Sequence, residues 1–452
     1  MPAKTTLVLF NRDLRVHDNP ALAAAARAER TVPLFVFDER LLGSRFAAPN
    51  RVAFMLEALH DLDDSLRRAG GRLFVRRGDP VEEAIAVARE ARASELHVSA
   101  DHSGYAQGRQ RRLARACEQE RIAFHAHPGV TIVPPGAVTP TGGDHFKVFT
   151  PYHRAWSELP LRERASRPRR LDVPGGVRGG RLPALAKLTD GRASSQRAKG
   201  GEREARRLMR AFLRDGLGEY EARHDDLPGD GTSRLSAPLR FGCLSPLELM
   251  REARERRGGE AFVRQLCWRD FHHQVLAAVP SLPHRDYRPR RDRWSRSRRA
   301  LEAWKQGRTG YPLIDAAMRQ LAAEGFMHNR ARMTVASFLC KDLYVDWREG
   351  AWHFWDLLSD GEIANNAGNW QWVAGTGNDT RPNRVLNPLR QAERFDPRGE
   401  YVRRYLPELE SVPGKAVHRP WLLEDFGKLD YPEPIVDHDE AAAAFKAHRE
   451  DA

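Results

Sequence analysis

The chain has 452 residues, of which 41% are hydrophobic, and its 74 Lys and Arg residues outnumber its 61 Asp and Glu residues. This length predicts two or three domains with a substantial buried core. The formal net charge of +13 favours an anionic partner, with nucleic acid as the first candidate, although a solvated basic surface is also consistent with it.

Cysteine spacing and hydropathy exclude several classes of protein. The four cysteines lie far apart, without a CxxC pair or a nearby Cys/His ligand spacing, which argues against a disulfide framework and a structural metal site. The apolar run Thr6–Phe10 is too short for a signal peptide, and no later run is long enough to span a bilayer. We therefore expect a soluble, cytoplasmic protein without a metal or a membrane partner.

Residues 1–130 alternate strand and helix patterns. The expected strands are Thr6–Phe10, Thr31–Asp38, Arg72–Arg76, Glu95–Ser99 and Ile122–Ala126, and the expected helices include Pro20–Ala28, Arg51–Ala69 and Pro80–Arg92. Asp79 is a suitable N-cap for the last of these helices, with Pro80 at the first helical position. This alternation predicts an α/β domain with a doubly wound parallel sheet. No GxGxxG follows the first strand, so a dinucleotide site of the common Rossmann type is not expected there.

The composition changes after this domain. Residues 131–200 are rich in Arg, Pro and Gly in places and predict a long surface linker between domains. Residues 201–440 show amphipathic helical patterns, among them Pro312–Glu324 and Ala331–Leu343, and a capping box at Ser245–Glu248. We expect an all-α domain here, in which eight of the ten tryptophans fall between Trp268 and Trp372.

Motifs in both expected domains occur together in one order. They are Phe10-Asn-Arg-Asp-Leu-Arg-Val-His-Asp18, Phe146–Pro151, Gly-Glu-Tyr220, Thr232–Ser236, Trp268–Phe271, Thr309–Asp315, His328–Arg332, Asp360–Glu362 and Asn366–Trp372. In this order the chain resembles the photolyase/cryptochrome family over residues 5 to 437, and it is most similar to class I cyclobutane pyrimidine dimer photolyases. The resemblance implies a Rossmann-like antenna domain, a long linker and a helical FAD-binding domain.

The resemblance also implies a set of FAD-binding residues. Thr232-Ser233-Arg234-Leu235-Ser236 brings three hydroxyls and a guanidinium together, which suits a pyrophosphate, although a surface turn has the same composition. Family members use this loop for the FAD phosphates, with Tyr220, Phe262 and Arg269 lining the same pocket. They pair the residues at Arg332 and Asp360 beside the isoalloxazine ring, near Gly361 and Glu362. Asn366 is at the position facing flavin N5, where a neutral amide supports the electron-donating state.

Three tryptophans are implied to carry electrons to the flavin. By the resemblance Trp370 is nearest the flavin, Trp347 follows it and Trp304 lies toward the surface. Any one of them, taken alone, is better explained by core packing.

On the lesion side, the resemblance implies contacts with flipped-out bases and the DNA backbone. The residues concerned are Gln265, Trp268, Asn329, Arg330, Met333, Trp372, Arg384 and Gln391. Dimer-repairing members usually have Glu where this chain has Gln265, and (6-4) photolyases share the Gln. The (6-4) class, however, needs two histidines where this chain has Asn329 and Met333. The segment Pro382–Arg384 is one residue shorter than usual, which weakens the alignment of Arg384.

The implied function is light-dependent repair of UV-damaged DNA, the carbon–carbon lyase reaction of deoxyribodipyrimidine photo-lyases. Excited reduced FAD is expected to donate an electron to the flipped cyclobutane dimer and to regain it once the ring has split. A second chromophore, 8-hydroxy-5-deazaflavin or methenyltetrahydrofolate, is expected near Arg51 and Asp101, although Arg51 is equally well explained as a surface residue. We expect a monomer. A (6-4) photolyase and a cryptochrome-like blue-light photosensor are the alternatives.

Overall fold

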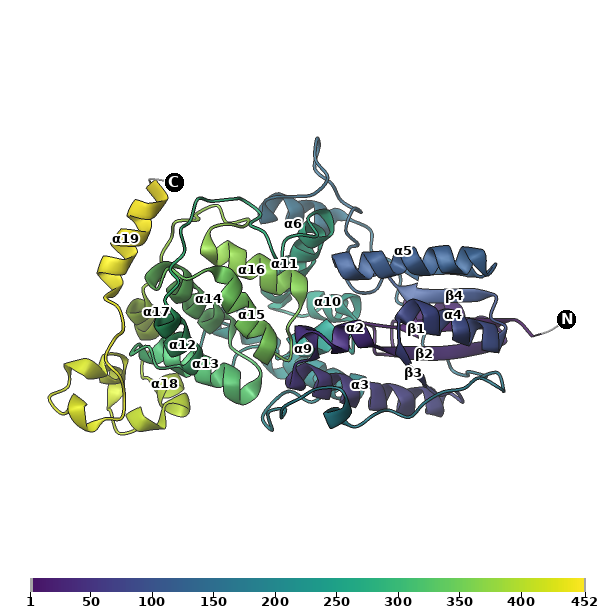
Figure 1. Ribbon diagram of the computed structural model, residues 1–452, viewed down its shortest axis with the longest axis horizontal. Helices are drawn as coiled ribbons and strands as arrows, with labels where there is room; N and C mark the ends of the chain where they lie inside the picture. Colours follow the sequence, from purple (N-terminus) through teal and green to yellow (C-terminus); the bar gives the residue numbers. More distant parts are fainter. Residues whose placement is uncertain (1–2, 451–452) are drawn as a thin grey trace. The chain divides into compact units, whose positions relative to one another are not determined.

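The computed structural model describes residues 3–450, and the chain divides into two compact units (Figure 1). The first unit comprises Met1–Ala193, Ala198–Gly218 and Ser233–Pro280, and the second comprises Ser194–Arg197, Glu219–Thr232 and Ser281–Ala452. This division falls at different positions from the expected domains 1–130, 131–200 and 201–440, which stay a prediction. The observed units differ from the expected domains partly because the segment after residue 198 packs on the α/β part. There Gly200 N–H donates to Glu57 at 2.7 Å and Arg203 pairs with Asp61 at 2.9 Å.

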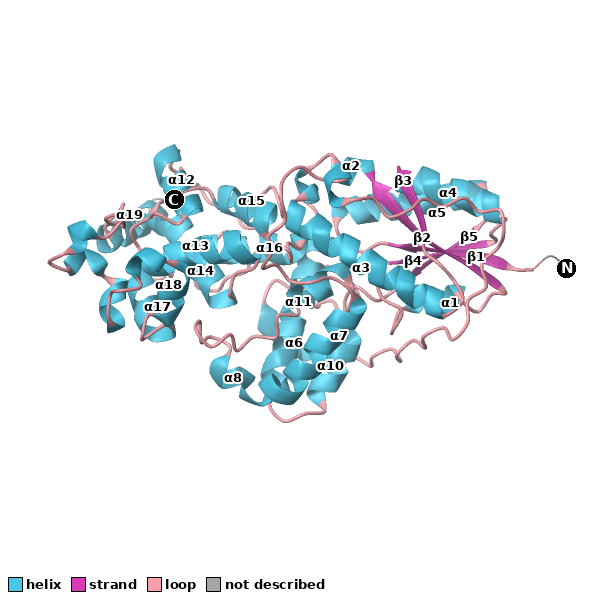
Figure 2. Ribbon diagram, turned by 90° about the horizontal axis from the view of Figure 1, so that it is seen from below, coloured by secondary structure: helices cyan, strands magenta, loops and turns pink. Residues whose placement is uncertain are grey.

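The first unit contains a five-stranded parallel sheet in the order β3-β2-β1-β4-β5. Its strands are β1 (Thr5–Phe10), β2 (Arg30–Asp38), β3 (Phe74–Gly78), β4 (Glu95–Ser99) and β5 (Ala123–His127). Helices α4 (Pro80–Ala91) and α5 (Gly104–Gln119) cover one face, and α1 (Pro20–Ala25) and α3 (Pro49–Arg68) lie on the other (Figure 2). The short α2 (Glu39–Leu42) follows β2. The predicted doubly wound sheet is confirmed, with each strand within two residues of its expected bounds.

Local capping signals were predicted correctly. The Asp79 carboxylate accepts hydrogen bonds from the N–H groups of Val81 and Glu82 at the start of α4. Ser245 Oγ accepts from the N–H of Glu248 at the start of α10 (Pro246–Arg254). Both caps satisfy amide groups that the first turn of a helix leaves unpaired, so these boundaries are encoded locally.

The expected linker is not entirely irregular. It contains α6 (Phe149–Glu158) and a short 3-10 turn at Leu185–Lys187. Trp156 of α6 is 2% exposed, and its Nε1 donates to Asp270 at 3.1 Å. The same carboxylate accepts from the N–H groups of Ile132 and Val133, both at 2.9 Å. The expectation of a surface connection throughout is therefore wrong for Ile132, Val133 and α6, which hydrogen bonds to Asp270 attach to α11 (Gly259–Ala278).

The regular secondary structure in the rest of the described chain is helical, apart from the isolated bridge between Ser295 and Val345. The first unit adds α7 (Glu202–Ala211), the π-helical turn Phe212–Gly216 and α9 (Ser236–Phe241). The second unit contains α8 (Tyr220–Arg223), α12 (Arg298–Gln306), α13 (Pro312–Glu324), α14 (Asn329–Ser337), α15 (Trp347–Leu357), α16 (Ile363–Ala374), α17 (Pro388–Phe395), α18 (Glu400–Tyr405) and α19 (His438–Glu450). The expected helix Ala331–Leu343 is α14 continued by a π-helical turn, Phe338–Asp342.

Each unit has its own apolar core. In the first unit one apolar cluster lies between the sheet and helices α4 and α5, and in the second the core is formed mainly by α13 to α16. All four cysteines are free and buried. Among the described residues, no helix combines the length and the apolar character that crossing a membrane would require.

Candidate functional site

An ion pair joins two of the predicted cofactor residues in the second unit. Arg332, near the start of α14, donates from Nη2 to Asp360 Oδ2 at 2.8 Å, and its Nε donates to the carbonyl oxygen of Met327 at 2.7 Å. The predicted pairing of Arg332 with Asp360 is thus confirmed. Asp360 Oδ1 is buried, and no donor among the described residues lies within hydrogen-bond distance of it. Because a buried carboxylate oxygen without a donor is unfavourable, this atom fits a ligand N–H.

The residues that follow Asp360 set the start of α16. The Glu362 carboxylate caps the helix by accepting from Asn365, both from its N–H at 2.9 Å and from its side-chain Nδ2 at 2.8 Å. Gly361 is buried between the two acids. Asn366 donates from Nδ2 to the carbonyl oxygen of Ala351 on α15 at 3.0 Å. This bond fixes the orientation of the Asn366 amide, the group predicted to face flavin N5.

Two of the predicted tryptophans, Trp370 and Trp347, lie on the neighbouring helices α16 and α15. Trp370 of α16 packs so closely on α15 that a Cβ at Gly350 would overlap its indole. Trp347 lies three residues before Gly350, on the same face of α15. Its Nε1 donates to Asp286 Oδ1 at 2.9 Å. Trp370 and Trp347 are both almost fully buried, so an electron passing between them would cross protein rather than solvent.

The predicted position of Trp304 near the surface is wrong. Its side chain is 0% exposed, and its Nε1 donates to the carbonyl oxygen of Val335 at 3.0 Å. Its ring centroid lies 6.1 Å from that of Trp370 in an edge-to-face contact. Trp304 therefore neighbours Trp370 and does not form the solvent end of a series that continues beyond Trp347.

Trp294, which is absent from the predicted set, is better placed for the solvent end. It is half-buried, and its ring centroid lies 5.1 Å from that of Tyr344. The next residue, Ser295, pairs with Val345, two residues before Trp347. In the sequence Trp294 stands alone among arginines between two helices, so no helical spacing marks it.

Predicted lesion residues of the second unit lie on α14 and around the end of α16. Asn329 Nδ2 is 3.9 Å from Met333 Sδ, which confirms that the two side chains share one face of α14. Trp372 is half-buried, and the guanidinium carbon of the exposed Arg384 lies 5.1 Å from its ring centroid. This stacking gives Arg384 a defined position despite the uncertain alignment of its segment.

Of the other two predicted contacts of this unit, Arg330 is held by protein groups and, within the described part of the chain, Gln391 Oε1 is not. Arg330 forms an ion pair with Asp225, with Nε 3.2 Å from Oδ1, and its guanidinium carbon lies 4.4 Å from the ring centroid of Phe395. A DNA phosphate would have to compete with Asp225 for this guanidinium. Gln391 lies on α17, and its buried Oε1 has no hydrogen-bond partner among the described residues.

In the first unit, α11 carries four predicted residues. Gln265 is exposed, and Trp268, three residues later, is half-buried with its indole stacked on Phe149 at a centroid distance of 3.7 Å. Phe149 is absent from the predicted site residues, although it belongs to the Phe146–Pro151 motif. Phe262 is 4% exposed, and Arg269 donates from Nη1 to the carbonyl oxygen of Val130 at 2.7 Å.

The predicted phosphate loop immediately precedes α9. Arg234 has a left-handed backbone with φ 54°, an uncommon conformation for a residue other than glycine. The N–H of Leu235 donates to Ser233 Oγ at 3.4 Å, and Ser236 is exposed as the first residue of α9. Thr232 belongs to the second unit, as does Tyr220, which is 8% exposed. The assignment of these residues to FAD phosphates stays a prediction.

Asp101, predicted to lie near a second chromophore, follows the carboxyl end of β4. Its Oδ1 lies 3.2 Å from Arg12 Nη1 and accepts from the N–H of His102 at 2.7 Å. Burial raises the pKa of Asp101, but Arg12, His102 and His273 outweigh burial and lower it to about 2. The carboxylate is therefore charged at neutral pH.

Arg51, the second predicted antenna residue, is 1% exposed in the first turn of α3. Its Nη2 donates to the carbonyl oxygens of Arg45 at 2.8 Å and Phe46 at 3.1 Å. The alternative that Arg51 is a plain surface residue is therefore wrong. It supports the turn before α3, and an antenna role for it stays a prediction.

Comparison with known proteins assigns the family. Residues 6–169 match the family model described as DNA photolyase, and residues 262–451 match the one described as the FAD-binding domain of DNA photolyase. A deoxyribodipyrimidine photo-lyase of Streptomyces griseus is 54% identical over 453 residues, which cover 98% of each chain. The chain belongs to the DNA photolyase family.

Solved structures give the same assignment for the fold of this photolyase. A class III photolyase from Agrobacterium tumefaciens superposes with a TM-score of 0.92 at 30% identity and covers 100% of this chain and 98% of that one. An archaeal photolyase from Sulfolobus tokodaii, solved with two FAD molecules, superposes with a TM-score of 0.88 at 32% identity and covers 99% and 100% of the two chains. The predicted α/β part followed by an all-helical FAD-binding part is thus confirmed.

Proposed function

We propose that this photolyase repairs cyclobutane pyrimidine dimers in UV-damaged DNA by a light-dependent carbon–carbon lyase reaction. The observation that carries the proposal is the Arg332–Asp360 pair, in which a buried carboxylate oxygen is left for a ligand N–H in the FAD-binding domain. The relative from Streptomyces griseus, named deoxyribodipyrimidine photo-lyase, supports the same reaction.

The residues present fit a bound flavin. Asp360 would accept an N–H of the isoalloxazine through Oδ1, while Arg332 holds its carboxylate in place. Asn366, held by the carbonyl oxygen of Ala351, would present a neutral amide to the ring. When bound in its reduced form, FAD supplies the light-excited electron that splits the dimer. The protein contributes orientation and exclusion of water, and it needs no nucleophile.

The residues on the lesion side favour the cyclobutane dimer over the (6-4) photoproduct. Asn329 and Met333 share the face of α14 on which (6-4) photolyases need two histidines, and neither side chain is able to donate and recover a proton as histidine does. Splitting a cyclobutane ring requires only electron transfer. Gln265 offers the lesion a neutral amide in place of the usual carboxylate.

A repair assay tests the proposal. Purified photoreduced protein is given separate oligonucleotides with a cyclobutane thymine dimer or a (6-4) photoproduct, in blue light and in the dark. We expect light-dependent restoration of the cyclobutane substrate alone. Repair of the (6-4) substrate alone would mean that the (6-4) photoproduct is the substrate. If protein with bound, reduced FAD repaired neither lesion, the proposed enzymatic activity would be wrong.

The FAD site has a separate test. Asp360→Ala removes the carboxylate that holds Arg332, so purified protein is expected to lose most of its flavin absorbance. Asp430→Ala is the matched control, because that side chain is 91% exposed and its ion pair with Arg308 spans 3.7 Å. Retention of FAD by the Asp360 variant would contradict the proposed site.

Three further features complete the proposal. We propose a second, light-harvesting chromophore in the α/β part near Asp101, with 8-hydroxy-5-deazaflavin preferred, whereas the Sulfolobus tokodaii relative was solved with a second FAD. The protein is reconstituted with each candidate chromophore in turn. The chromophore that binds should add an absorption band, and Asp101→Ala should weaken that band. We also propose that the protein is a cytoplasmic monomer, and light scattering of the protein as it elutes from a sizing column tests its mass.

A further inference from the structure

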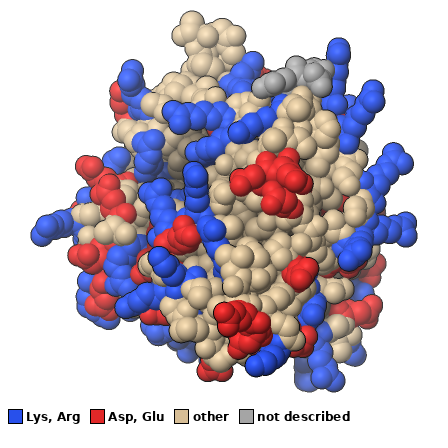
Figure 3. Space-filling view, turned by 90° about the vertical axis from the view of Figure 1, so that its left-hand side faces the viewer, with Lys and Arg blue, Asp and Glu red and all other residues tan. Residues whose placement is uncertain are grey.

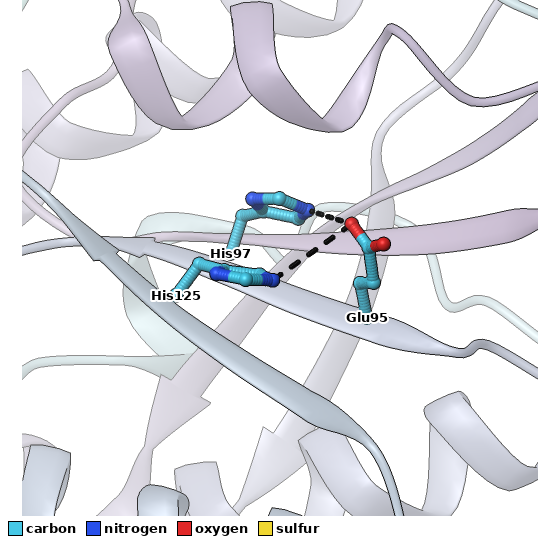
Figure 4. Close-up of side chains that lie close together, drawn as sticks. All are labelled: Glu95, His97 and His125. Carbon is cyan, nitrogen blue, oxygen red and sulfur yellow. Dashed lines mark hydrogen bonds and ion pairs between the residues drawn. The ribbon is translucent and has the colours of Figure 1, made fainter.

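Three side chains from two neighbouring strands converge on one face of the sheet. Glu95 and His97 lie two residues apart on β4, and His125 of β5 is directly opposite His97 in the parallel register. Since side chains alternate along a strand, Leu96 and Val98 point to the core under α4 and α5, and Glu95 and His97 point to the other face. Figure 4 shows both imidazoles turned toward the same carboxylate.

The donor atoms are close enough to share an ion. Glu95 Oε2 lies 3.2 Å from His97 Nε2 and 3.9 Å from His125 Nε2 (Figure 4). All three ligand atoms lie within 4.8 Å of one another. Zinc bonds of about 2.0–2.1 Å place the ligand atoms of a tetrahedral site about 3.3–3.4 Å apart, so closure around an ion needs only a small movement of the exposed His125 ring.

The surroundings orient these ligands as they would in a metal site. His97 Nδ1 lies 3.0 Å from His127 Nε2, so the His97 ring is fixed through the nitrogen that faces away from Glu95. Glu95 Oε1 is 2.5 Å from Lys4 Nζ, which leaves Oε2 to face the two imidazoles. Glu95, His97 and His125 thus each turn one ligand atom toward the others, and His127 supports the arrangement.

Solvent reaches the cluster from one side. His97 is 3% exposed, whereas the His125 side chain is 44% exposed on the edge strand β5. An ion entering past His125 would meet the buried His97 and the carboxylate behind it. Spacing along the chain hides this cluster, because Glu95 and His97 are separated from His125 by a whole strand–helix–strand connection.

We propose that Glu95, His97 and His125 bind one divalent transition-metal ion, with Zn²⁺ the best match and water in the fourth position. Two imidazoles and one carboxylate form a ligand set that zinc accepts, and such a set suits Zn²⁺, Ni²⁺ or Cu²⁺ better than Mg²⁺ or Ca²⁺. The ion joins β4 to the edge strand β5 and stabilises that edge of the sheet. This proposal does not depend on the repair function.

Zinc titration of the full-length, FAD-containing protein tests the site. The protein carries no histidine tag, is freed of metal with a chelator, and is titrated calorimetrically with ZnCl₂. We expect one equivalent to bind to the wild type, and Glu95→Gln and His125→Ala each to weaken binding by at least about 10-fold. His125 is exposed and Glu95→Gln keeps the side-chain shape, so both variants should fold.

A matched control and a second readout sharpen the result. His60→Ala removes an exposed histidine from α3 and should leave zinc affinity unchanged. Zinc should also raise the thermal unfolding midpoint of the wild type and of His60→Ala, but not that of Glu95→Gln. The proposal is overturned if the wild type binds no zinc, or if both ligand variants bind zinc as tightly as the wild type does.

Discussion

Gly350 has no side chain at a point where the Trp370 indole fills the adjacent space. A Cβ there would overlap the outer edge of the indole and also approach Leu339. We therefore expect Gly350→Ala to push α15 and α16 apart and to destabilise the protein by about 1–3 kcal/mol, the range typical of an overpacked core. The thermal unfolding midpoint, followed by circular dichroism, measures the effect.

Gly108 provides the matched control for this substitution. It lies within α5, and nothing lies within 4 Å of the place where its Cβ would be. Gly108→Ala should therefore be neutral or stabilise the protein by about 0.5–1 kcal/mol, because alanine has the higher helix propensity. Equal effects at both glycines would mean that the contact between Gly350 and Trp370 does not constrain the core.

Trp304 is buried and Trp294 is partly exposed, so replacing each of them by phenylalanine should slow flavin photoreduction to a different extent. An external reductant must meet the solvent end of the electron path, and Trp304 is 0% exposed. We expect Trp294→Phe to slow steady-state photoreduction of bound FAD severalfold, and Trp304→Phe to have a smaller effect. Flavin bleaching under blue light with a thiol donor measures both rates. If photoreduction were lost in the Trp304 variant alone, the predicted order with Trp304 at the solvent end would be correct after all.

At the scale of elements, the sequence was sufficient to predict helices and strands wherever residues close together in the chain determine them. The buried strands, the Asp79 and Ser245 caps and the Pro312–Glu324 helix follow from short-range patterns and were predicted to within a residue or two. Helix α6 was missed because what holds it is tertiary. Its Trp156 bonds to Asp270, which lies more than a hundred residues away in the chain. The positions of Trp304 and of the Glu95–His97–His125 cluster depend on packing in the same way.

One of the contacts that attach helix α19 is made by its first residue, His438. His438 Nδ1 is in hydrogen-bond contact with Asp342 Oδ1, and burial raises the pKa of Asp342 to about 6 despite this partner. Burial alone would lower the pKa of His438, but Asp342 and the nearby Asp439 and Asp437 raise it. The contact with Asp342 therefore favours the protonated form of His438 in the folded protein.

The sign of the pH dependence follows from the raised pKa of His438. Its stabilising contribution is fully present below the unfolded value of 6.5 and is lost as pH rises through the folded pKa. We expect the thermal unfolding midpoint to fall as pH rises above about 6.5, and His438→Gln to flatten this fall, because glutamine does not titrate. His60→Gln on α3 is the control and should keep the wild-type slope. An unchanged slope in His438→Gln would contradict the assignment.

On the scale of the whole molecule, the face drawn in Figure 3 carries its positive charge in many places rather than in a single area. Figure 3 shows Lys and Arg side chains spread over the face toward which α17 to α19 lie, among smaller groups of Asp and Glu. Many arginines are already paired, as Arg330 is with Asp225 and Arg348 is with Asp286. The net charge of +13 therefore predicts general attraction to DNA but does not locate the contact surface.

Salt dependence separates specific phosphate contacts from this general attraction. Each neutralised phosphate adds about 0.9 to the slope of log affinity against log salt concentration, so binding to dimer-containing duplex should weaken steeply with salt. Arg384→Ala should lower that slope by about 1 if its guanidinium, stacked on Trp372, contacts a phosphate. Arg170→Ala removes the same charge at an 83% exposed position and should leave the slope nearly unchanged.

Both variants have one positive charge fewer, so net charge alone predicts equal slopes. Fluorescence anisotropy over a series of salt concentrations decides between the two outcomes. Equal slopes would mean that Arg384 acts only through the overall field, whereas a selective loss in Arg384→Ala would place the DNA backbone beside Trp372.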